Sequence, residues 1–220
     1  MNYLTIIGIV LIVIILYYII QYAFSGGTLT STSSAKKATT ISSDKVEAKA
    51  NFTYSIWFYI DDWNYKFGNT KTILSKGHQN FEINLGKEDN NLNIAIELAS
   101  KNKLVHHCNV PNVPIQKWVS CIVSIYGRSM DVYINGKLVR TCILENVAKL
   151  NKSDIKITPN GGFSGYTSSF QFIPDATNPE EAYNIYKKGN GTNFLASILG
   201  KYKFRVEFLK DNQTMTSLEI

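Results

Sequence analysis

Alternating apolar and polar positions in the middle of the chain predict strands. From Trp118 to Leu144 the sequence reads WVSCIVSIYGRSMDVYINGKLVRTCIL, with three short apolar runs and two turns. The apolar face of the first two runs consists of Val119, Cys121, Val123, Ile125, Met130, Val132 and Ile134. Successive side chains of a strand point to opposite sides, so this pattern predicts a sheet with one face on a core. Asn135-Gly136 predicts a tight hairpin because both central positions of a type I′ turn need positive φ, and Gly127-Arg128 predicts the other turn.

The run from Asn51 to Ile60 is apolar on both faces, with Trp57 and Tyr59 opposite the face that carries Phe58. This suits a central strand that is covered on both sides, or an aromatic patch on the outside of a sheet. Further alternation predicts strands at 81–85, 92–98, 104–108 and 155–157, and a terminal hairpin at 201–220 with its turn at Asp211-Asn212.

One short helix is predicted near the C-terminal end, from Pro179 to Lys188. Asn178 is a good N-cap, Pro179 suits the first helical position, and Gly189 suits a left-handed C-terminal cap. Its packing stripe is predicted to consist of Ala182, Tyr183, Ile185 and Tyr186.

The chain opens with an uncharged apolar stretch from Leu4 to Phe24. As a helix it would extend about 32 Å, enough to cross a bilayer. A cleaved signal peptide would need a charged leading region and a shorter apolar core. We therefore expect a transmembrane anchor at 1–24, a flexible linker rich in Gly, Ser, Thr and Ala at 25–50, a β-sandwich at 51–189 and a C-terminal β-hairpin extension at 190–220.

The orientation across the membrane stays open. Lys36 and Lys37 follow the apolar stretch and weakly favour a cytoplasmic domain. Glycosylation sequons, usable only on the lumenal or extracellular side, occur at Asn51, Asn151, Asn190 and Asn212. In an asparagine-rich chain such triplets also arise by chance.

Composition narrows the classes of function. A chain of 220 residues with 45% hydrophobic residues buries one main core. The net charge of +6 is modest, and no stretch combines clustered Lys and Arg with stacking aromatics as a nucleic-acid groove requires. We therefore expect no nucleic acid among the partners.

The central motif, a Trp opening a strand followed by a strand ending in VYINGKL, resembles the meander of laminin-G-like and pentraxin-like domains in the concanavalin A-like lectin/glucanase superfold. Two later segments, GFSGYTSSFQFI and NPEEAYNIY, are similar to the closing strand and the tail of laminin-G-like domains. The resemblance implies a mainly β protein, an antiparallel jelly roll over 51–189. It says little about activity, because this fold hosts lectins, hydrolases and adhesion modules.

Glycoside hydrolysis on this superfold needs paired carboxylates, commonly spaced as E-x-D-x-x-E. Glu82, Glu88, Asp89 and Glu97 lie in different runs or in a turn. We therefore expect no enzyme, no catalytic residue and no cofactor.

Calcium is a separate candidate, since some relatives in the resembled family bind it through loop oxygens. Asp61, Asp62 and Asn64 cluster in one loop, and Asp89, Asn90 and Asn91 in another. Turn formation by Asx residues explains both clusters equally well.

The histidines and cysteines match no metal signature. His106 and His107 are adjacent in a predicted strand and so point to opposite faces, and no Cys/His spacing resembles a zinc site. Cys108 and Cys142 are candidates for a disulfide between neighbouring strands, which would leave Cys121 buried. Three reduced thiols in a reducing compartment are the open alternative.

The segments CNVPNVPIQKWVSCIVSIYGRSMDVYINGKLVRTC and GGFSGYTSSFQF with NPEEAYNIYKKG resemble membrane-anchored proteins of nucleocytoplasmic large DNA viruses. That resemblance implies a single-pass virion protein, a minor capsid or inner-membrane component whose partners are the lipid bilayer and other capsid proteins. The alternative is a membrane-displayed carbohydrate-binding module, with Trp57, Trp63 and Tyr65 as the residues that stack on sugar rings.

Overall fold

The computed structural model describes residues 11–18, 27–46, 49–77 and 79–191, and the backbone of 205–210 and 213–219. The chain divides into two units, Met1–Asn190 and Gly191–Ile220. The second unit contains β13 (Arg205–Lys210) and β14 (Gln213–Glu219), which pair antiparallel and confirm the predicted terminal hairpin.

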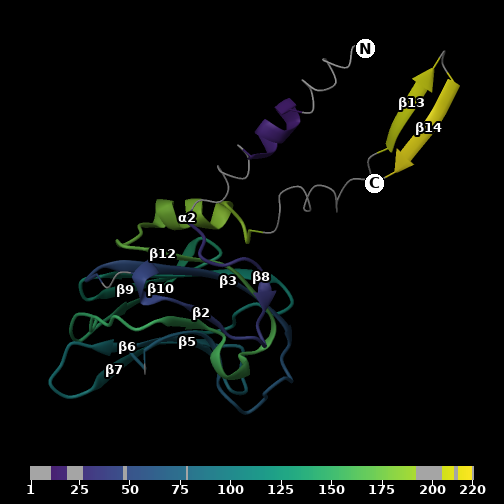
Figure 1. Cartoon of the computed structure of the whole chain (residues 1–220). Helices are drawn as coiled ribbons and strands as arrows, with labels where there is room; N and C mark the ends of the chain where they lie inside the picture. The colour runs from purple at the N-terminus through teal and green to yellow at the C-terminus, as the bar shows by residue number, and fades with distance from the viewer. Residues whose placement is uncertain are drawn as a thin grey trace. The chain divides into compact units, whose positions relative to one another are not determined.

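Two six-stranded antiparallel sheets form the sandwich of the first unit (Figure 1). Sheet A has the order β1-β12-β3-β8-β9-β10 and sheet B the order β2-β11-β4-β5-β6-β7. The strands of sheet A are β1 (Ser33–Ser34), β3 (Phe52–Asp62), β8 (Trp118–Tyr126), β9 (Ser129–Ile134), β10 (Lys137–Ile143) and β12 (Ser164–Ile173). The strands of sheet B are β2 (Thr39–Ile41), β4 (Lys71–Lys76), β5 (Phe81–Leu85), β6 (Leu92–Leu98), β7 (Leu104–Val110) and β11 (Ile155–Ile157). This arrangement confirms the predicted mainly β antiparallel sandwich. Two 3₁₀ turns, η1 (Ser43–Lys45) and η2 (Pro159–Gly161), lie in connections.

The core between the sheets contains the predicted apolar face of β8 and β9. Its members are fully buried except Ile134, which is partly buried against the same core. The hairpin between β9 and β10 has φ values of 51° at Asn135 and 74° at Gly136, as the predicted turn requires. Period-2 alternation therefore identified the inward side of these strands correctly.

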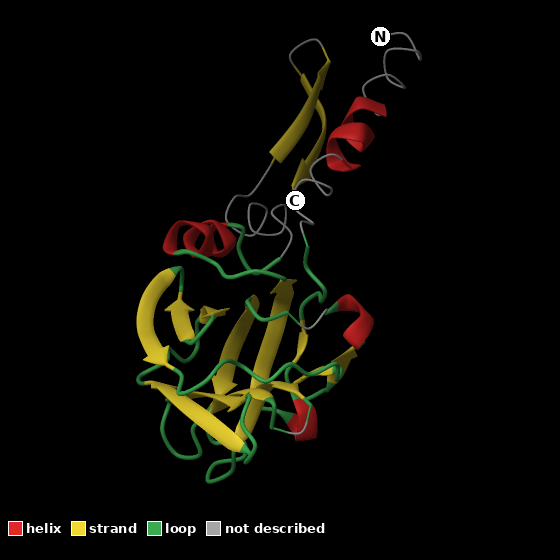
Figure 2. Cartoon of the chain, turned by 90° about the vertical axis from the view of Figure 1, so that its left-hand side faces the viewer, coloured by secondary structure: helices red, strands yellow, loops and turns green. Residues whose placement is uncertain are grey.

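A second, smaller core lies on the opposite face of sheet A. The helix α2 (Pro179–Lys187) covers this face (Figures 1 and 2), and Ala182 and Ile185 pack there against Ile122 and Tyr133. The Tyr133 hydroxyl donates to the carbonyl oxygen of Thr177 at 3.3 Å and anchors the segment that leads into α2. Sheet A is thus buried on both sides where α2 crosses it.

The helix begins as its sequence predicts. The Asn178 side chain accepts a hydrogen bond from the Glu181 amide, and the Glu181 carboxylate accepts one from the Asn178 amide, so a capping box is complete. Gly189 has φ 78°, the left-handed value expected after the last turn. The predicted stripe was wrong for Tyr183, which is 48% exposed.

The segment predicted as a flexible linker at 25–50 contributes strands to the sandwich. β1 pairs with β12, β2 pairs with β11, and Ala35, Ile41 and Val46 are buried in the main core. The linker prediction is therefore wrong for the described part of this segment. Two strands of two and three residues carry too few apolar positions to show a period, and backbone hydrogen bonds to the sheets hold them instead.

Residues 11–18 are helical. Within the ranges that the structure describes, no helix has the length and apolar character needed to cross a bilayer. The rest of the predicted anchor, 1–10 and 19–24, lies outside the described residues.

Candidate binding surfaces

The three predicted sugar-stacking residues do not form one site. Trp57 lies on the face of sheet A that α2 covers, is 7% exposed and stacks on Tyr186 with ring centroids 5.5 Å apart and planes at 17°. A sugar ring has no access to its face. The prediction for Trp57 is wrong because alternation identified its side of the strand but not the helix that lies over it.

Trp63 and Tyr65 lie in the loop after β3, where both rings take part in contacts within the protein. The Trp63 indole donates to the Glu88 carbonyl oxygen at 3.1 Å, and the Lys71 ammonium lies 4.4 Å from its ring centroid. The Tyr65 hydroxyl donates to the Gly161 carbonyl oxygen at 3.1 Å, and the Lys36 ammonium lies 4.7 Å from its ring. These cation–π and hydrogen-bond contacts hold the loop.

A different aromatic set lies on the outer face of sheet A. Tyr166 of β12 pairs with Tyr59 of β3, and Tyr59 pairs with Trp118 of β8, so the three rings form one cross-strand row. The ring centroids are 6.4 Å and 5.8 Å apart along it. Tyr166 is 47% exposed and the other two are partly exposed. We call Tyr59, Trp118 and Tyr166 the aromatic row; it is the outward aromatic patch that the 51–60 run allowed.

Gly165 makes the aromatic row possible. At this residue φ is +148°, and a Cβ would lie 1.9 Å from the Tyr59 carbonyl oxygen. The pairing of β12 with β3 shifts register between Ser164 and Gly165. The close approach at this bulge brings Tyr166 beside Tyr59.

The outer face of sheet B is polar. One cross-strand row contains Thr40, Lys156, Ser75, Glu82, Ala95 and His107, and the next contains Thr72, Asn84, Asn93 and Asn109. A groove of about 730 Å³ lies over β4, β5 and β11, with hydroxyl, carboxylate and ammonium groups from Thr72, Ser75, Glu82, Asp154 and Lys156 in its lining. We call these two rows the polar face.

Hydrogen bonds on the polar face organise its side chains. Asn84 donates to the Glu82 carboxylate at 3.0 Å, and its own carbonyl oxygen is buried with no partner among the residues the structure describes. Asn93 donates to Asn109, and the Asn93 oxygen lies 3.2 Å from Nδ1 of His107. The amides are therefore held in position along adjacent strands.

The candidate calcium residues form turns. The Asp62 carboxylate accepts a hydrogen bond from the Asn64 amide at 2.9 Å, and the Asp89 carboxylate accepts one from the Asn91 side chain at 2.6 Å. Asp61 is exposed. In the described ranges, no group of three or more His, Cys, Asp or Glu side chains is placed to hold a metal ion. His78 lies outside these ranges.

Cys108 and Cys142 form a disulfide with Cα atoms 6.1 Å apart. Cys108 is on β7, the edge of sheet B, and Cys142 is on β10, the edge of sheet A. The bond therefore joins the two sheets, and the expectation of neighbouring strands was wrong because the partners face each other across the core. Cys121 is a buried free thiol, and burial raises its pKa to about 12.

The model of the concanavalin A-like lectin/glucanases superfamily matches residues 32–182. The chain belongs to this superfamily. The matched range begins next to β1, which agrees with the placement of 33–46 inside the concanavalin A-like sandwich.

Solved structures similar to this concanavalin A-like chain include binding domains of botulinum neurotoxins. The serotype D/C VPI 5993 binding domain has a TM-score of 0.55 and 16% identity, and the match covers 73% of this chain and 46% of that one. The receptor binding domain of the C/D mosaic serotype has a TM-score of 0.52 and 18% identity, covering 63% and 37%. The binding domain of neurotoxin DC in complex with rat synaptotagmin II has a TM-score of 0.51 and 18% identity, covering 62% and 35%.

The match thus spans less than half the length of each neurotoxin chain, and at these identities the likeness shows the fold alone. No curated protein matches the sequence.

Proposed function

We propose that this protein is a structural binding protein rather than an enzyme: a minor capsid or inner-membrane virion component that links a membrane to the capsid shell. Residues 1–24 hold it in the bilayer, and the concanavalin A-like sandwich contacts neighbouring capsid proteins. The uncharged stretch from Leu4 to Phe24 and the resemblance to membrane-anchored viral proteins support this proposal.

The observation that carries it is the aromatic row. Tyr and Trp are enriched at the centres of protein interfaces because they bring large contact areas on few rotatable bonds. Tyr59 and Trp118 already pack against each other, so a partner that covers them loses little side-chain entropy. Tyr166 is 47% exposed, so a capsid protein that contacts it would bury its exposed surface.

A photo-crosslinking residue in place of Tyr166 tests the contact inside purified virus particles. The matched control places the same residue at Tyr126, which is 68% exposed and lies at the far end of β8. We expect a crosslink to a capsid protein from position 166 and none from position 126. Absence of the protein from particles, or equal crosslinking from both positions, would contradict the proposal.

The anchor has its own test. The full chain should remain in the membrane pellet after alkaline carbonate extraction. Replacement of Ile12 and Ile15 by Lys should release it, because each buried lysine costs about 3 kcal/mol at the centre of a spanning helix. The matched control replaces the same residues by Leu and should stay in the pellet. Extraction of the unchanged chain would refute the membrane anchor and would leave the proposed contact of the aromatic row unaffected.

The polar face of sheet B favours a second candidate function, a membrane-displayed carbohydrate-binding module. Amide, hydroxyl and carboxylate groups in a groove are the groups that bind sugar hydroxyls. A glycan array should use the full chain in a zwitterionic detergent, because a glycoside detergent would compete. Saturable binding that Glu82→Gln abolishes and Glu145→Gln leaves unchanged would favour this function. Glu145 is exposed in the loop after β10 and serves as the matched control.

A further inference from the structure

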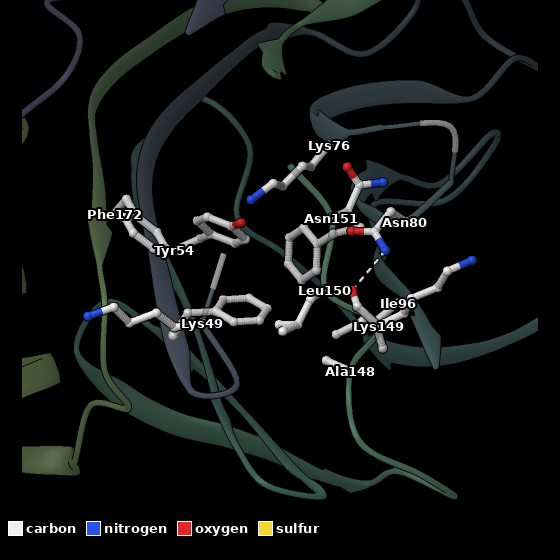
Figure 3. Close-up of a pocket in the computed structure, with 12 residues that line it drawn as sticks. Lys49, Tyr54, Lys76, Asn80, Ile96, Ala148, Lys149, Leu150, Asn151 and Phe172 are labelled. Atoms are coloured by element: carbon white, nitrogen blue, oxygen red, sulfur yellow. Dashed lines mark hydrogen bonds between the residues drawn. The ribbon is translucent and has the colours of Figure 1, made fainter. Parts of the chain in front are cut away.

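A pocket opens between the two sheets where β3 begins and β4 ends (Figure 3). Phe52, Tyr54 and Phe172 line it from sheet A, and Lys76, Phe81 and Ile96 line it from sheet B. The loop 148–151, Asn80 and Lys49 complete the lining. Its volume of about 20 Å³ holds one or two water-sized groups.

Two polar groups from buried residues point into this pocket. Lys76 is 4% exposed and lies in the inward-facing cross-strand row with Ile155 and Phe81. Tyr54 is 2% exposed. Figure 3 shows the Lys76 ammonium and the Tyr54 hydroxyl directed toward one another. Among the residues that the structure describes, no hydrogen bond or ion pair involves either group, and neither polar atom is among those fully shut off from solvent.

Lys71 is the other inward-facing lysine of β4, and its buried ammonium has contacts that replace water. Lys71 is 1% exposed, donates to the carbonyl oxygens of Gly86 and Lys87 at 3.3 Å and 3.0 Å, and lies over the Trp63 ring. Burial lowers the pKa of both lysines, because the charged form loses its hydration. Lys76 has no such contacts among the described residues, so only water in the pocket can solvate its ammonium, and an anion that pairs with it would replace that water.

The charge around the pocket selects an anion. The twelve residues that line it include Lys76 and Lys149 and no Asp or Glu. Lys149 is paired with Glu97 at 2.6 Å, and the buried Asn80 donates to the Lys149 carbonyl oxygen at 3.0 Å. These contacts hold the loop at the pocket in place and leave the Lys76 ammonium as the charge that faces inward.

We propose that this pocket binds a carboxylate. Lys76 forms an ion pair with one or both carboxylate oxygens, and the Tyr54 hydroxyl donates a hydrogen bond to one of them. The rings of Phe52, Phe81 and Phe172 form apolar walls for the carbon atoms next to the carboxyl group. The small volume admits little more than the two carboxylate oxygens, so the ligand is a carboxyl group whose stem extends toward the mouth of the pocket, from a free short-chain acid or from an acidic side chain. The site is independent of the proposed virion role.

Thermal unfolding of the full chain in a zwitterionic detergent tests the site, followed by tryptophan fluorescence. Sodium acetate replaces sodium chloride at constant ionic strength and pH 7, and N-acetyl-aspartate amide forms a second arm. We expect a saturable rise in the midpoint, about 3 to 6 °C at ten times the dissociation constant. A larger rise with the aspartate derivative than with acetate identifies an acidic side chain as the source, and the reverse identifies a free acid.

Three variants assign the effect to the pocket. Lys76→Met keeps the stem, removes the charge and should abolish the acetate response. Tyr54→Phe keeps the ring and should weaken that response several-fold. Lys71→Met is the matched control, a buried lysine on the same strand, and should lower the midpoint in chloride yet keep the response.

Saturation-transfer NMR from the protein to the acetate methyl group measures binding without unfolding, and it serves if a variant is too unstable for a thermal scan. We expect transfer in the unchanged protein and none in Lys76→Met. An unchanged midpoint in acetate, or a response that survives Lys76→Met, overturns the proposal and leaves an internal water as the occupant.

Discussion

Removal of the Cys108–Cys142 disulfide should destabilise the sandwich by about 4 kcal/mol. The bond closes a loop with a sequence separation of 34, and the chain-entropy relation gives about 4 kcal/mol for a loop of that length at 25 °C. The bond also joins β7 and β10, the open edges of the two sheets. Because both cysteines are at least nine-tenths buried, replacement by alanine should add about 1 kcal/mol for the space that the sulfur atoms leave.

The assay is equilibrium urea unfolding of the full chain, followed by the fluorescence of its three tryptophans. The perturbed protein is the Cys108→Ala/Cys142→Ala double variant. Cys121→Ala is the matched control, since it removes a buried sulfur but leaves the bond intact. The control should lose only the cavity contribution.

Thiol counting supplies an independent readout. Alkylation of the denatured, unreduced protein should modify one cysteine, Cys121, and alkylation after reduction should modify all three. Three modified cysteines without reduction, or a double variant that is no less stable than Cys121→Ala, would refute the reasoning. Disulfides of this kind persist in oxidising compartments. If residues 1–24 anchor the chain in a membrane as proposed, the bond favours the side opposite to the one that Lys36 and Lys37 indicate.

Three further substitutions test the helix α2, the aromatic row and the dependence of stability on pH. Ile185→Ala should cost about 2 to 4 kcal/mol by undoing the small core beneath α2, whereas the exposed Tyr183→Ala should cost less than about 1 kcal/mol; urea unfolding compares them. Gly165→Ala should sharply reduce the yield of folded protein, because its Cβ would lie 1.9 Å from a carbonyl oxygen; a normal yield and midpoint would contradict the contact described here. The hydrogen bond from Lys149 lowers the pKa of Glu97, so its contribution to stability is complete above the ordinary value of 4.5 and is lost as the pH falls through the lower folded value. A thermal midpoint measured between pH 6 and 3 should therefore fall less steeply for Glu97→Gln than for the unchanged protein.

The aromatic row shows why the sequence located strands but not binding surfaces. Tyr59 and Trp118 were recognisable as outward positions of separate strands. Their meeting with Tyr166 depends on the register of three strands and on the bulge at Gly165. This register depends on pairing between distant segments: Tyr59 and Tyr166, for example, are more than one hundred positions apart. No local sequence pattern predicts such pairing.

The sequence by itself determined the inward face of β8 and β9, the Asn135-Gly136 turn and the capped start of α2. Each depends on the backbone geometry of a few consecutive residues, which local chemistry fixes. The tertiary structure alone decided that 33–46 joins the sheets, that Trp57 lies under α2, that the disulfide spans the two sheets, and that Lys76 and Tyr54 share one pocket. These depend on which segments the packing of the core brings together, and the energy of that packing comes from contacts that are distant in the chain.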